Sequence, residues 1–288
     1  MSDSIMGFVR QLRGEWFLLL RSRAVWAACI LSMALAAGRV ALLRLQSEAG
    51  EVHRAAQGRA GAAPADPSGY APFADGLSWG FLVAFLSLTV FSSLSIALDR
   101  ERGTIRLPLV RGTSRTGLVL GKFAALVVAG FALLAAATGS AAAAAAVFYD
   151  FGPVVEDRYE IFSEATICRE VLTALAAAAV TLPAAAALGL FVSALARSGA
   201  AAAAAGLLAT VGFDVLEGAL GRPAGWVFLS YAPSLLDDSL LKEASKLARG
   251  YSDAGFSAER LWLNFAVPLP EAAFLLGFTL WIFARRRM

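Results

Sequence analysis

Long apolar runs, separated by short charged segments, dominate the pattern of the chain. Three of these runs contain no charged residue, namely 77–98, 123–149 and 171–196. Three more runs contain one or two charges each, and they cover 24–43, 198–221 and 261–284. A membrane helix needs about 20 mostly apolar residues. The pattern therefore predicts an all-α, polytopic membrane protein with six transmembrane helices in a single domain over 1–288.

A different pattern precedes the first run, where apolar residues recur at helical spacing. One face of this segment carries Ile5, Phe8, Leu12, Trp16 and Leu19. Arg10 and Arg13 lie on the opposite face. This pattern is typical of a helix that lies in the headgroup plane, and we expect an amphipathic interfacial helix over 5–23.

Two segments between the runs also have a recognisable composition. The stretch 48–72 is rich in Ala, Gly and Pro, which favours a flexible loop. Within the segment 222–260, leucines recur at helical spacing; Ser234 and Asp237 resemble a capping box and Gly250 ends the pattern. We expect an amphipathic helix over 234–249.

The composition and the distribution of charge support a membrane protein with a defined orientation. Hydrophobic residues make up 58% of the chain and charged residues 16%, which excludes the disordered and disulfide-built classes. The net charge of +3 is too small to indicate a nucleic-acid partner. Lys and Arg gather before residue 24, in the connection 99–122 and at the C-terminus. The positive-inside rule places both termini and this connection in the cytoplasm, and 222–260 outside.

Ionisable residues inside membrane spans are costly and often functional. Arg39 lies in the first span, Asp214 and Glu217 in the fifth and Glu271 in the sixth. Arg39 could pair with Asp214 or Glu271 at a similar depth. Such a pair could be part of a gate on the substrate path, or a structural ion pair beside side chains that reach the interface. Both interpretations stay open at this point.

Proline residues mark two of the spans. Pro183 lacks a backbone donor and should kink the span 171–196, which could form a hinge, although membrane helices also kink without one. Pro268 and Pro270 precede Glu271 and predict a broken start to the last span. Backbone groups freed there must face protein or water, so Glu271 is the best sequence indication of a polar cavity.

Patterns for catalysis or metal binding are weak. His53 is the only histidine, and the two cysteines lack metal-ligand spacing. The Gly-Lys pair at 121–122 does not complete a P-loop, because Thr116 and Phe123 stand where Gly and Ser or Thr are required. We expect no cofactor or metal on this chain and no enzymatic activity of its own.

The connection between the second and third spans contains the densest mixture of charges. It begins with Asp99-Arg100-Glu101-Arg102-Gly103-Thr104, continues through Ser114-Arg115 and ends with Gly121-Lys122. The positive-inside rule alone explains this composition. The alternative is a docking surface for a cytosolic protein, because mixed charges orient a partner.

This connection resembles the signature that follows the second span in ABC type-2 exporter permeases. The matching residues are Asp99, Arg100, Glu101, Gly103, Thr104, Ser114, Arg115, Gly121 and Lys122. The N-terminal helix resembles the elbow helix of that family, and the six-span layout is similar over essentially the whole chain. Pro108 and Gly112 depart from the usual aliphatic residue and proline. Within the family, the short six-span form looks closest to permeases of copper-enzyme maturation.

The resemblance implies a permease subunit that works as a dimer in a bacterial-type cytoplasmic membrane and exports an unidentified substrate. A separate cytosolic ATPase would bind ATP and Mg and dock on the connection 99–122. The resemblance, together with the charges of this segment, assigns the coupling to Asp99, Arg100, Glu101, Arg102, Gly103, Thr104 and Arg115.

The residues alone leave two alternatives to this interpretation. One is an ion-coupled secondary transporter that uses Glu271 and Asp214 as proton sites and needs no ATPase. The other is a membrane-embedded scaffold or enzyme, which the lack of a catalytic constellation disfavours.

Overall fold

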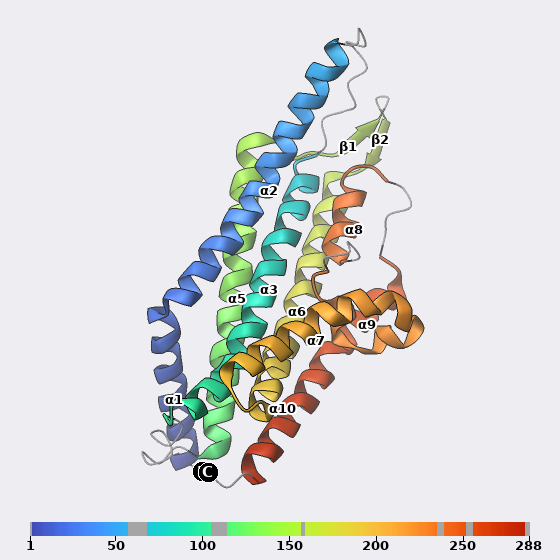
Figure 1. Cartoon of the computed structure of the whole chain (residues 1–288). Coiled ribbons are helices and arrows are strands. Elements are labelled where there is room, and N and C mark those ends of the chain that lie inside the picture. The colour runs from blue at the N-terminus through green and yellow to red at the C-terminus, as the bar shows by residue number, and fades with distance from the viewer. Residues whose placement is uncertain are drawn as a thin grey trace.

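The computed structural model describes residues 2–56, 68–104, 114–156, 159–234, 239–251 and 256–285. The long helices are α1 Ser2–Arg21, α2 Arg23–Ala56, α3 Tyr70–Glu101, α5 Arg115–Phe148, α6 Glu164–Leu195, α7 Gly199–Leu220 and α10 Pro268–Arg285 (Figure 1). The short elements are the hairpin β1 Val154–Glu156 and β2 Tyr159–Phe162, the 3-10 turns η1 Arg222–Trp226 and η2 Phe228–Tyr231, and the helices α8 Leu240–Leu247 and α9 Ala258–Ala266.

Six stretches within the described residues are long and apolar enough to cross a membrane. They are Arg23–Gly50, Tyr70–Glu101, Arg115–Phe148, Glu164–Leu195, Gly199–Leu220 and Ala258–Arg285. The predicted all-α, polytopic fold with six spans is therefore confirmed.

Serine residues define the starts of four helices. Ser114 Oγ accepts the N–H of Gly117 at 3.0 Å, and Ser163, Ser198 and Ser257 cap α6, α7 and α9 in the same way. A capping hydroxyl satisfies one of the backbone donors that the first turn of a helix leaves unpaired. These serines explain why the apolar runs begin as helices at the observed positions.

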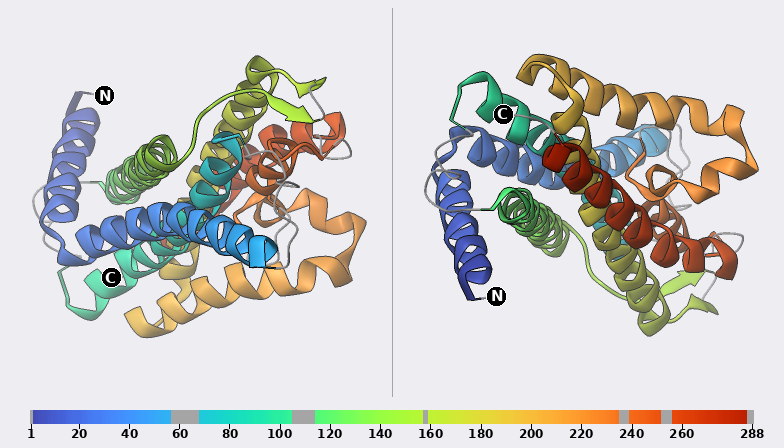
Figure 2. Two further views of the ribbon diagram at one scale, coloured as in Figure 1. Left: turned by 90° about the horizontal axis from the view of Figure 1, so that it is seen from above. Right: turned by 90° about the horizontal axis from the view of Figure 1, so that it is seen from below.

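The helix α3 lies inside the bundle, where it packs against α2, α5, α6, α7 and α8 (Figure 2). Close approach to α6 and α7 depends on glycine, because a Cβ at Gly189 would collide with Ser92 Oγ and one at Gly206 with Ser93 Oγ. Small residues allow membrane helices to pack closely in this way. The central position of α3 lets its ends contact many other elements.

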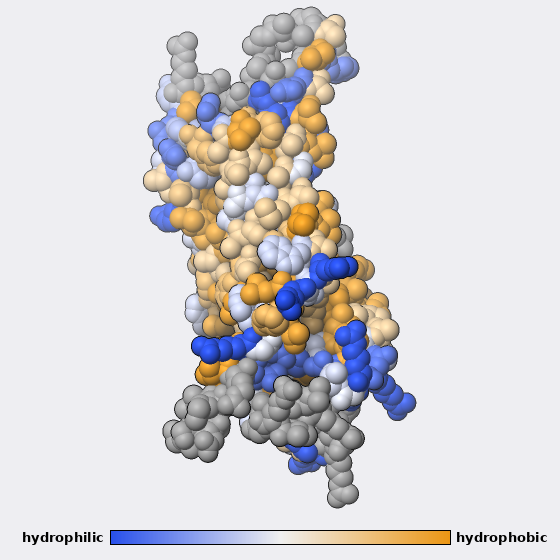
Figure 3. All heavy atoms as spheres, turned by 90° about the vertical axis from the view of Figure 1, so that its left-hand side faces the viewer, coloured by the Kyte–Doolittle hydropathy of each residue, from blue (hydrophilic) through white to orange (hydrophobic). Residues whose placement is uncertain are grey.

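The outer layer consists of α2, α7 and the pair α9–α10. In their most apolar stretches 22% of the residues are buried, against 56% for α3, α5 and α6. Figure 3 shows the face over α1, α2 and α5, where hydrophobic side chains cover the middle and hydrophilic ones lie toward the two ends. An exposed apolar belt of this kind is the surface that a bilayer covers.

The loop expected over 48–72 is wrong at both of its ends. The helix α2 continues to Ala56, and α3 already begins at Tyr70; the residues between 56 and 68 lie outside the described part. No proline interrupts α2 before Ala56, and Arg44 Nε donates to Glu48 Oε1 at 2.9 Å. Such an i,i+4 pair supports a helix, which explains why the composition was misleading.

The helix expected over 234–249 begins later than the sequence indicated. The helix α8 starts after Ser239, and the Ser234 hydroxyl donates to Asp214 Oδ1 at 2.7 Å instead of capping a helix. Asp237 lies outside the described residues. The hairpin, in which Val155 pairs with Glu160, was not predicted at all.

The two proline predictions have different outcomes. The broken start of the last span is confirmed, because α9 ends at Ala266 and α10 begins at Pro268. The helix α6 continues without interruption through Pro183, so the hinge at that position stays a prediction.

Candidate functional site

We call the end of the bundle that holds α1 and the last turn of α10 the basal end, and the opposite end, with the hairpin and α8, the apical end (Figure 1). The start of α5 is joined to α10 at the basal end, where Arg115 Nη1 donates to the Ala284 carbonyl at 3.2 Å. The N-terminal helix, the described parts of the connection 99–122 and the C-terminal helix thus share one end, as the charge pattern predicted.

Lys122 is a buried cation that joins three helices at the basal end. Its Nζ lies 2.8 Å from Glu15 Oε1 in α1 and 2.8 Å from Asp99 Oδ2 in α3. Gln11 Nε2 donates to the same Glu15 oxygen at 2.8 Å. Because a buried charge is costly without partners, these ion pairs hold the ends of α1, α3 and α5 together.

Gly121 allows α1 to approach α5 closely enough for this ion pair. A Cβ at this position would lie 2.8 Å from Gln11 Cγ and 3.2 Å from Gln11 Cβ. The Gly-Lys pair of the sequence signature therefore combines close packing with an ionic contact to the same helix.

Replacing Gly121 by leucine is expected to displace α1 and to lower the free energy of unfolding by about 2 kcal/mol, as overpacking does. Gly139 in the same helix provides the matched control, because a Cβ there meets nothing within 4 Å. The readout is the rate of tryptic cleavage at the exposed Arg13 of the detergent-solubilised protein. Cleavage should be faster in Gly121→Leu than in Gly139→Leu, and equal rates would contradict this packing role.

Arg100 caps the basal end of α6. Its guanidinium donates to the carbonyls of Ser193 at 3.3 Å, Ala194 at 3.4 Å and Ala196. The last carbonyls of a helix lack partners within the helix and carry partial negative charge. Ser193 Oγ in turn accepts the N–H of Ala97 at 2.8 Å. A side chain of α3 thus binds the backbone of α6, and a side chain of α6 binds the backbone of α3.

Glu101 binds the start of the next helix. Its Oε2 accepts the N–H of Gly199 at 2.9 Å, at the first residue of α7. An anion is favourable at a helix N-terminus, as a cation is at a C-terminus. Arg100 therefore compensates the partial negative charge at the C-terminus of α6, and Glu101 compensates the partial positive charge at the N-terminus of α7.

The turn after α3 is exposed and consists of Arg102, Gly103 and Thr104. Gly103 has a φ of 71°, a conformation that favours glycine. Thr104 Oγ1 donates to the Asp99 carbonyl at 3.2 Å. Residues 105–113 of the predicted connection lie outside the described residues.

The structure therefore divides the predicted coupling residues into two groups. One group binds other helices of the chain and consists of Asp99, Arg100, Glu101 and Arg115, which contact α5, α6, α7 and α10 respectively. The other group is the exposed turn Arg102–Thr104. Sequence reasoning missed Glu15 and Ser193. No pattern in the sequence indicates which helix a buried acid pairs with or which hydroxyl binds the backbone of another helix.

The predicted pairing of Arg39 with Asp214 or Glu271 is wrong. Arg39 binds Asp75 of α3, with Nη2 3.0 Å and Nε 3.2 Å from Asp75 Oδ2. Arg249 Nη2 lies 3.2 Å from the same oxygen, and Lys242 Nζ lies 3.8 Å from Asp75 Oδ1. The Asp75 carboxylate is buried and joins α2, α3 and the α8 segment at the apical end.

Glu271 and Asp214 instead bind the segment between α7 and α8. Glu271 Oε2 accepts the N–H of Phe228 at 2.7 Å, at the start of η2, and Asp214 binds Ser234. Burial raises the pKa of the Tyr231 phenol in this segment, so it stays protonated and donates to the Gly225 carbonyl at 2.6 Å. Both acids thus bind the segment that contains the two 3-10 turns and follows α7.

These two groups of charges lie at different heights along the bundle. Thirteen residues of α10 separate Glu271 from Ala284, which corresponds to about 20 Å of helix. Twenty-six residues of α3 separate Asp75 from Glu101, or about 39 Å. Along the helices, Asp75 is therefore about twice as far from the basal end as Glu271.

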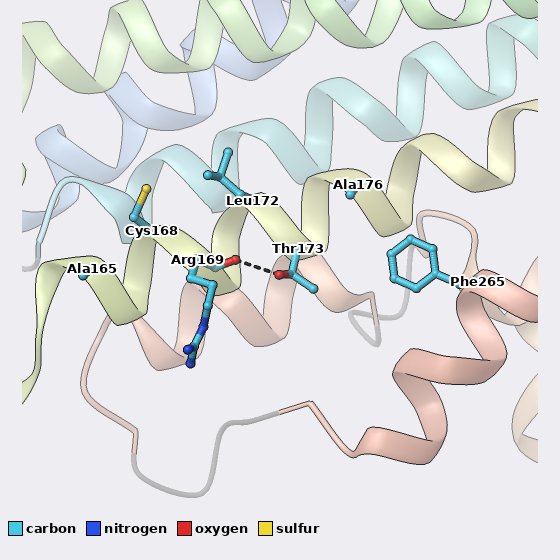
Figure 4. Close-up of a pocket in the computed structure, with 7 residues that line it drawn as sticks. All are labelled: Ala165, Cys168, Arg169, Leu172, Thr173, Ala176 and Phe265. Atoms are coloured by element: carbon cyan, nitrogen blue, oxygen red, sulfur yellow. Dashed lines mark hydrogen bonds between the residues drawn. The ribbon is translucent and has the colours of Figure 1, made fainter.

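One surface groove contains none of the predicted site residues. It has a volume of about 520 Å³ and lies between the start of α6 and α9, with an apolar wall that includes Leu172, Ala176 and Phe265 (Figure 4). Arg169 at its rim pairs with Glu170 at 3.2 Å. Within the described residues there is also no group of three His, Cys, Asp or Glu side chains that could hold a metal ion.

Six apolar spans, with α3 inside the bundle and charged contacts at both ends, define a polytopic membrane protein. The comparison with known families goes further, since residues 12–221 match the model of the ABC-2 family transporter proteins. The match covers well over half of the chain, from within α1 to the end of α7, so the chain belongs to this family of membrane transport proteins. Among curated proteins, no sequence matches the chain closely enough to add a relative. The narrower resemblance to permeases of copper-enzyme maturation stays a prediction.

Proposed function

We propose that the chain is the permease subunit of an ABC exporter in a bacterial-type cytoplasmic membrane, with both termini and the basal end in the cytoplasm. A separate ATPase would bind ATP and Mg and dock on the basal end. Two copies of the chain and two ATPases would form the working unit, and residues 222–260 would face the outside. The substrate stays unidentified.

The observation that carries this proposal is the set of contacts made by the last turn of α3. Asp99, Arg100 and Glu101 contact α5, α6 and α7 respectively, and through Lys122 this turn also holds α1. A displacement of the connection after α3 would therefore act on four other helices at once. ATP binding can bias the permease only through contacts that differ between its two states, and this turn is the place where such contacts converge.

Asp214 and Glu271 remain the candidates for the substrate path, together with Pro183. Both acids bind backbone or hydroxyl groups of the segment after α7, so a tilt of α7 or α10 would move that segment. Arg39 pairs with Asp75, which lies farther from the basal end than Glu271. A gate that includes Arg39 would therefore need Asp75 as its partner. The ion-coupled alternative is not favoured, because the family is one of ABC transporters.

The proposal is tested by purification of the full chain from its native membranes with a mild detergent. We expect a soluble protein with a P-loop to co-purify, and its ATP hydrolysis to change when the permease is removed. Transport that continues with a proton gradient and without any ATPase would overturn the proposal.

Replacing Glu101 by glutamine is expected to uncouple ATP hydrolysis from transport while the ATPase stays bound. The side chain is exposed, so the loss of its charge costs less than about 1 kcal/mol of stability, but the link between α3 and α7 weakens. The measurement is the ratio of substrate moved to ATP hydrolysed in proteoliposomes. Glu48→Gln, an exposed acid of α2 far from the basal end, is the control. An unchanged ratio would show that Glu101 has no part in coupling.

A further inference from the structure

A pocket opens under the bend between α1 and α2, and we refer to it as the elbow pocket. It has a volume of about 420 Å³ and lies between α1, α2, α3 and α5 at the basal end. A second, entirely apolar-walled pocket of about 120 Å³ shares Leu19 and Val25 with it. Along α5 the lining continues from Lys122 and Leu126 in the first pocket to Leu133 in the second. The two pockets lie next to each other along α5, from the basal end toward the middle of the bundle.

The basal part of the elbow pocket is lined by charged groups. Lys122 is shared by Glu15 and Asp99, so this group of three carries one excess negative charge. Arg102 lines the same pocket and is exposed, and its guanidinium has no partner among the described residues. The pocket thus presents one cation and one excess anion side by side.

Two hydroxyl groups and a long apolar wall complete the lining. Ser22 and Ser95 face the pocket, and neither hydroxyl has a side-chain partner among the described residues. The walls are apolar above them, with Leu18, Phe91 and Leu94 in the first pocket and two tryptophans in the second. A ligand that fits has a polar end with both charges and an apolar chain, because burial of apolar surface favours binding.

We propose that the elbow pocket binds one phospholipid of the cytoplasmic leaflet whose headgroup carries a phosphate and a primary amine. The phosphate binds Arg102, the ammonium binds the carboxylates of Glu15 and Asp99, and one acyl chain follows α5 toward Leu133. This inference rests on the proposed function only for the orientation of the basal end.

The charges distinguish this headgroup from other common ones. An ammonium has three N–H donors for the two carboxylates, whereas a quaternary choline has none. A glycerol headgroup has no cation for the excess negative charge. A free phosphate would leave the apolar walls unfilled. The zwitterionic amine headgroup is therefore the one that satisfies both charges and the wall.

The test is native mass spectrometry of the full chain, equilibrated in micelles with equal amounts of phosphatidylethanolamine, phosphatidylglycerol and phosphatidylcholine of the same acyl chains. We expect one phosphatidylethanolamine per chain, retained about ten-fold over each of the other two, as one charge-assisted contact provides. Equal retention of the three lipids, or a preference for phosphatidylglycerol or phosphatidylcholine, would overturn the proposal.

Four variants locate the site. Arg102→Gln should lower retention about five-fold, and Ser95→Phe should lower it by filling the pocket. The matched controls are Arg23→Gln and Ala27→Phe, exposed positions of α2 that do not line the pocket. If Ser95→Phe fails to fold, Arg102→Gln decides alone, since it changes only a surface charge. Retention that is the same in Arg102→Gln and Arg23→Gln would overturn the site. No ATPase is present in this experiment, so its failure leaves the proposed function untouched.

Discussion

Replacing Lys122 by methionine is expected to lower the free energy of unfolding of the chain by about 3 kcal/mol. The methionine has a similar length but leaves the carboxylates of Glu15 and Asp99 facing each other without a cation. The Glu15 side chain is 15% exposed, so water can compensate only in part. The loss should appear as a lower midpoint in an SDS titration of the purified protein.

A second substitution tests whether Lys122→Met lowers stability because it removes a charge and not because it changes the shape of the side chain. The double variant Glu15→Gln, Lys122→Met removes one of the two acids, and we expect it to recover a large part of the lost stability. Lys246→Met is the matched control, because Lys246 also pairs with an acid at 2.8 Å but is 49% exposed; its effect should stay below about 0.5 kcal/mol. A Lys122→Met effect as small as that of the control would refute the role of this ion pair.

Replacing Asp75 by asparagine is expected to loosen the apical end by about 2 kcal/mol. The change leaves Arg39, Lys242 and Arg249 near a neutral amide in place of a buried carboxylate. The partial exposure of Arg249, 39%, moderates the cost. The α8 segment is held to α3 by this contact and by the Ser245 hydroxyl, which donates to the Ala71 carbonyl at 3.1 Å.

The measurement for Asp75→Asn is the rate of tryptic cleavage after Lys242, Lys246 and Arg249, the basic residues of the α8 segment. We expect cleavage to be about thirty-fold faster than in the unaltered chain, if cleavage follows the opening equilibrium. Asp150→Asn, which changes an exposed acid at the same end, should leave the rate unchanged. The double variant Asp75→Asn, Arg39→Gln should slow the cleavage again. If all four proteins are cleaved at one rate, Asp75 does not hold α8.

The sequence predicted the membrane spans well because their signal is local. An apolar run of sufficient length has few alternatives to a membrane helix. The proline pair interrupts the last span at Pro268 whatever the tertiary contacts of that segment are. The mixed charges at 99–104 also marked the position where helices converge. What the spacing did not reveal is that Arg100 and Glu101 bind the two ends of the α6–α7 turn, since this depends on the packing of α3 between α6 and α7.

The wrong predictions concern contacts between residues far apart in the chain, which depend on how far along the bundle each residue lies. The predicted apolar run 77–98 begins after Asp75, whereas helix α3 begins five residues before Asp75 and brings it to Arg39. Asp214 and Glu271 were assigned similar depths to Arg39, because the ends of the spans are uncertain from the sequence. The hairpin has only short strands, which give a weak signal. Tertiary packing overrides local preference in such segments.

The claim that the basal end receives the ATPase is tested most directly by site-specific cross-linking in native membranes. Cys29 and Cys168 are replaced by serine, and a single cysteine is introduced at Thr104 on the basal end or at Tyr159, which is 79% exposed in the hairpin at the apical end. With a reagent that joins thiols to amines, Thr104→Cys should form a cross-linked product with a P-loop ATPase and Tyr159→Cys should form none. A product from Tyr159→Cys but not from Thr104→Cys would contradict the account.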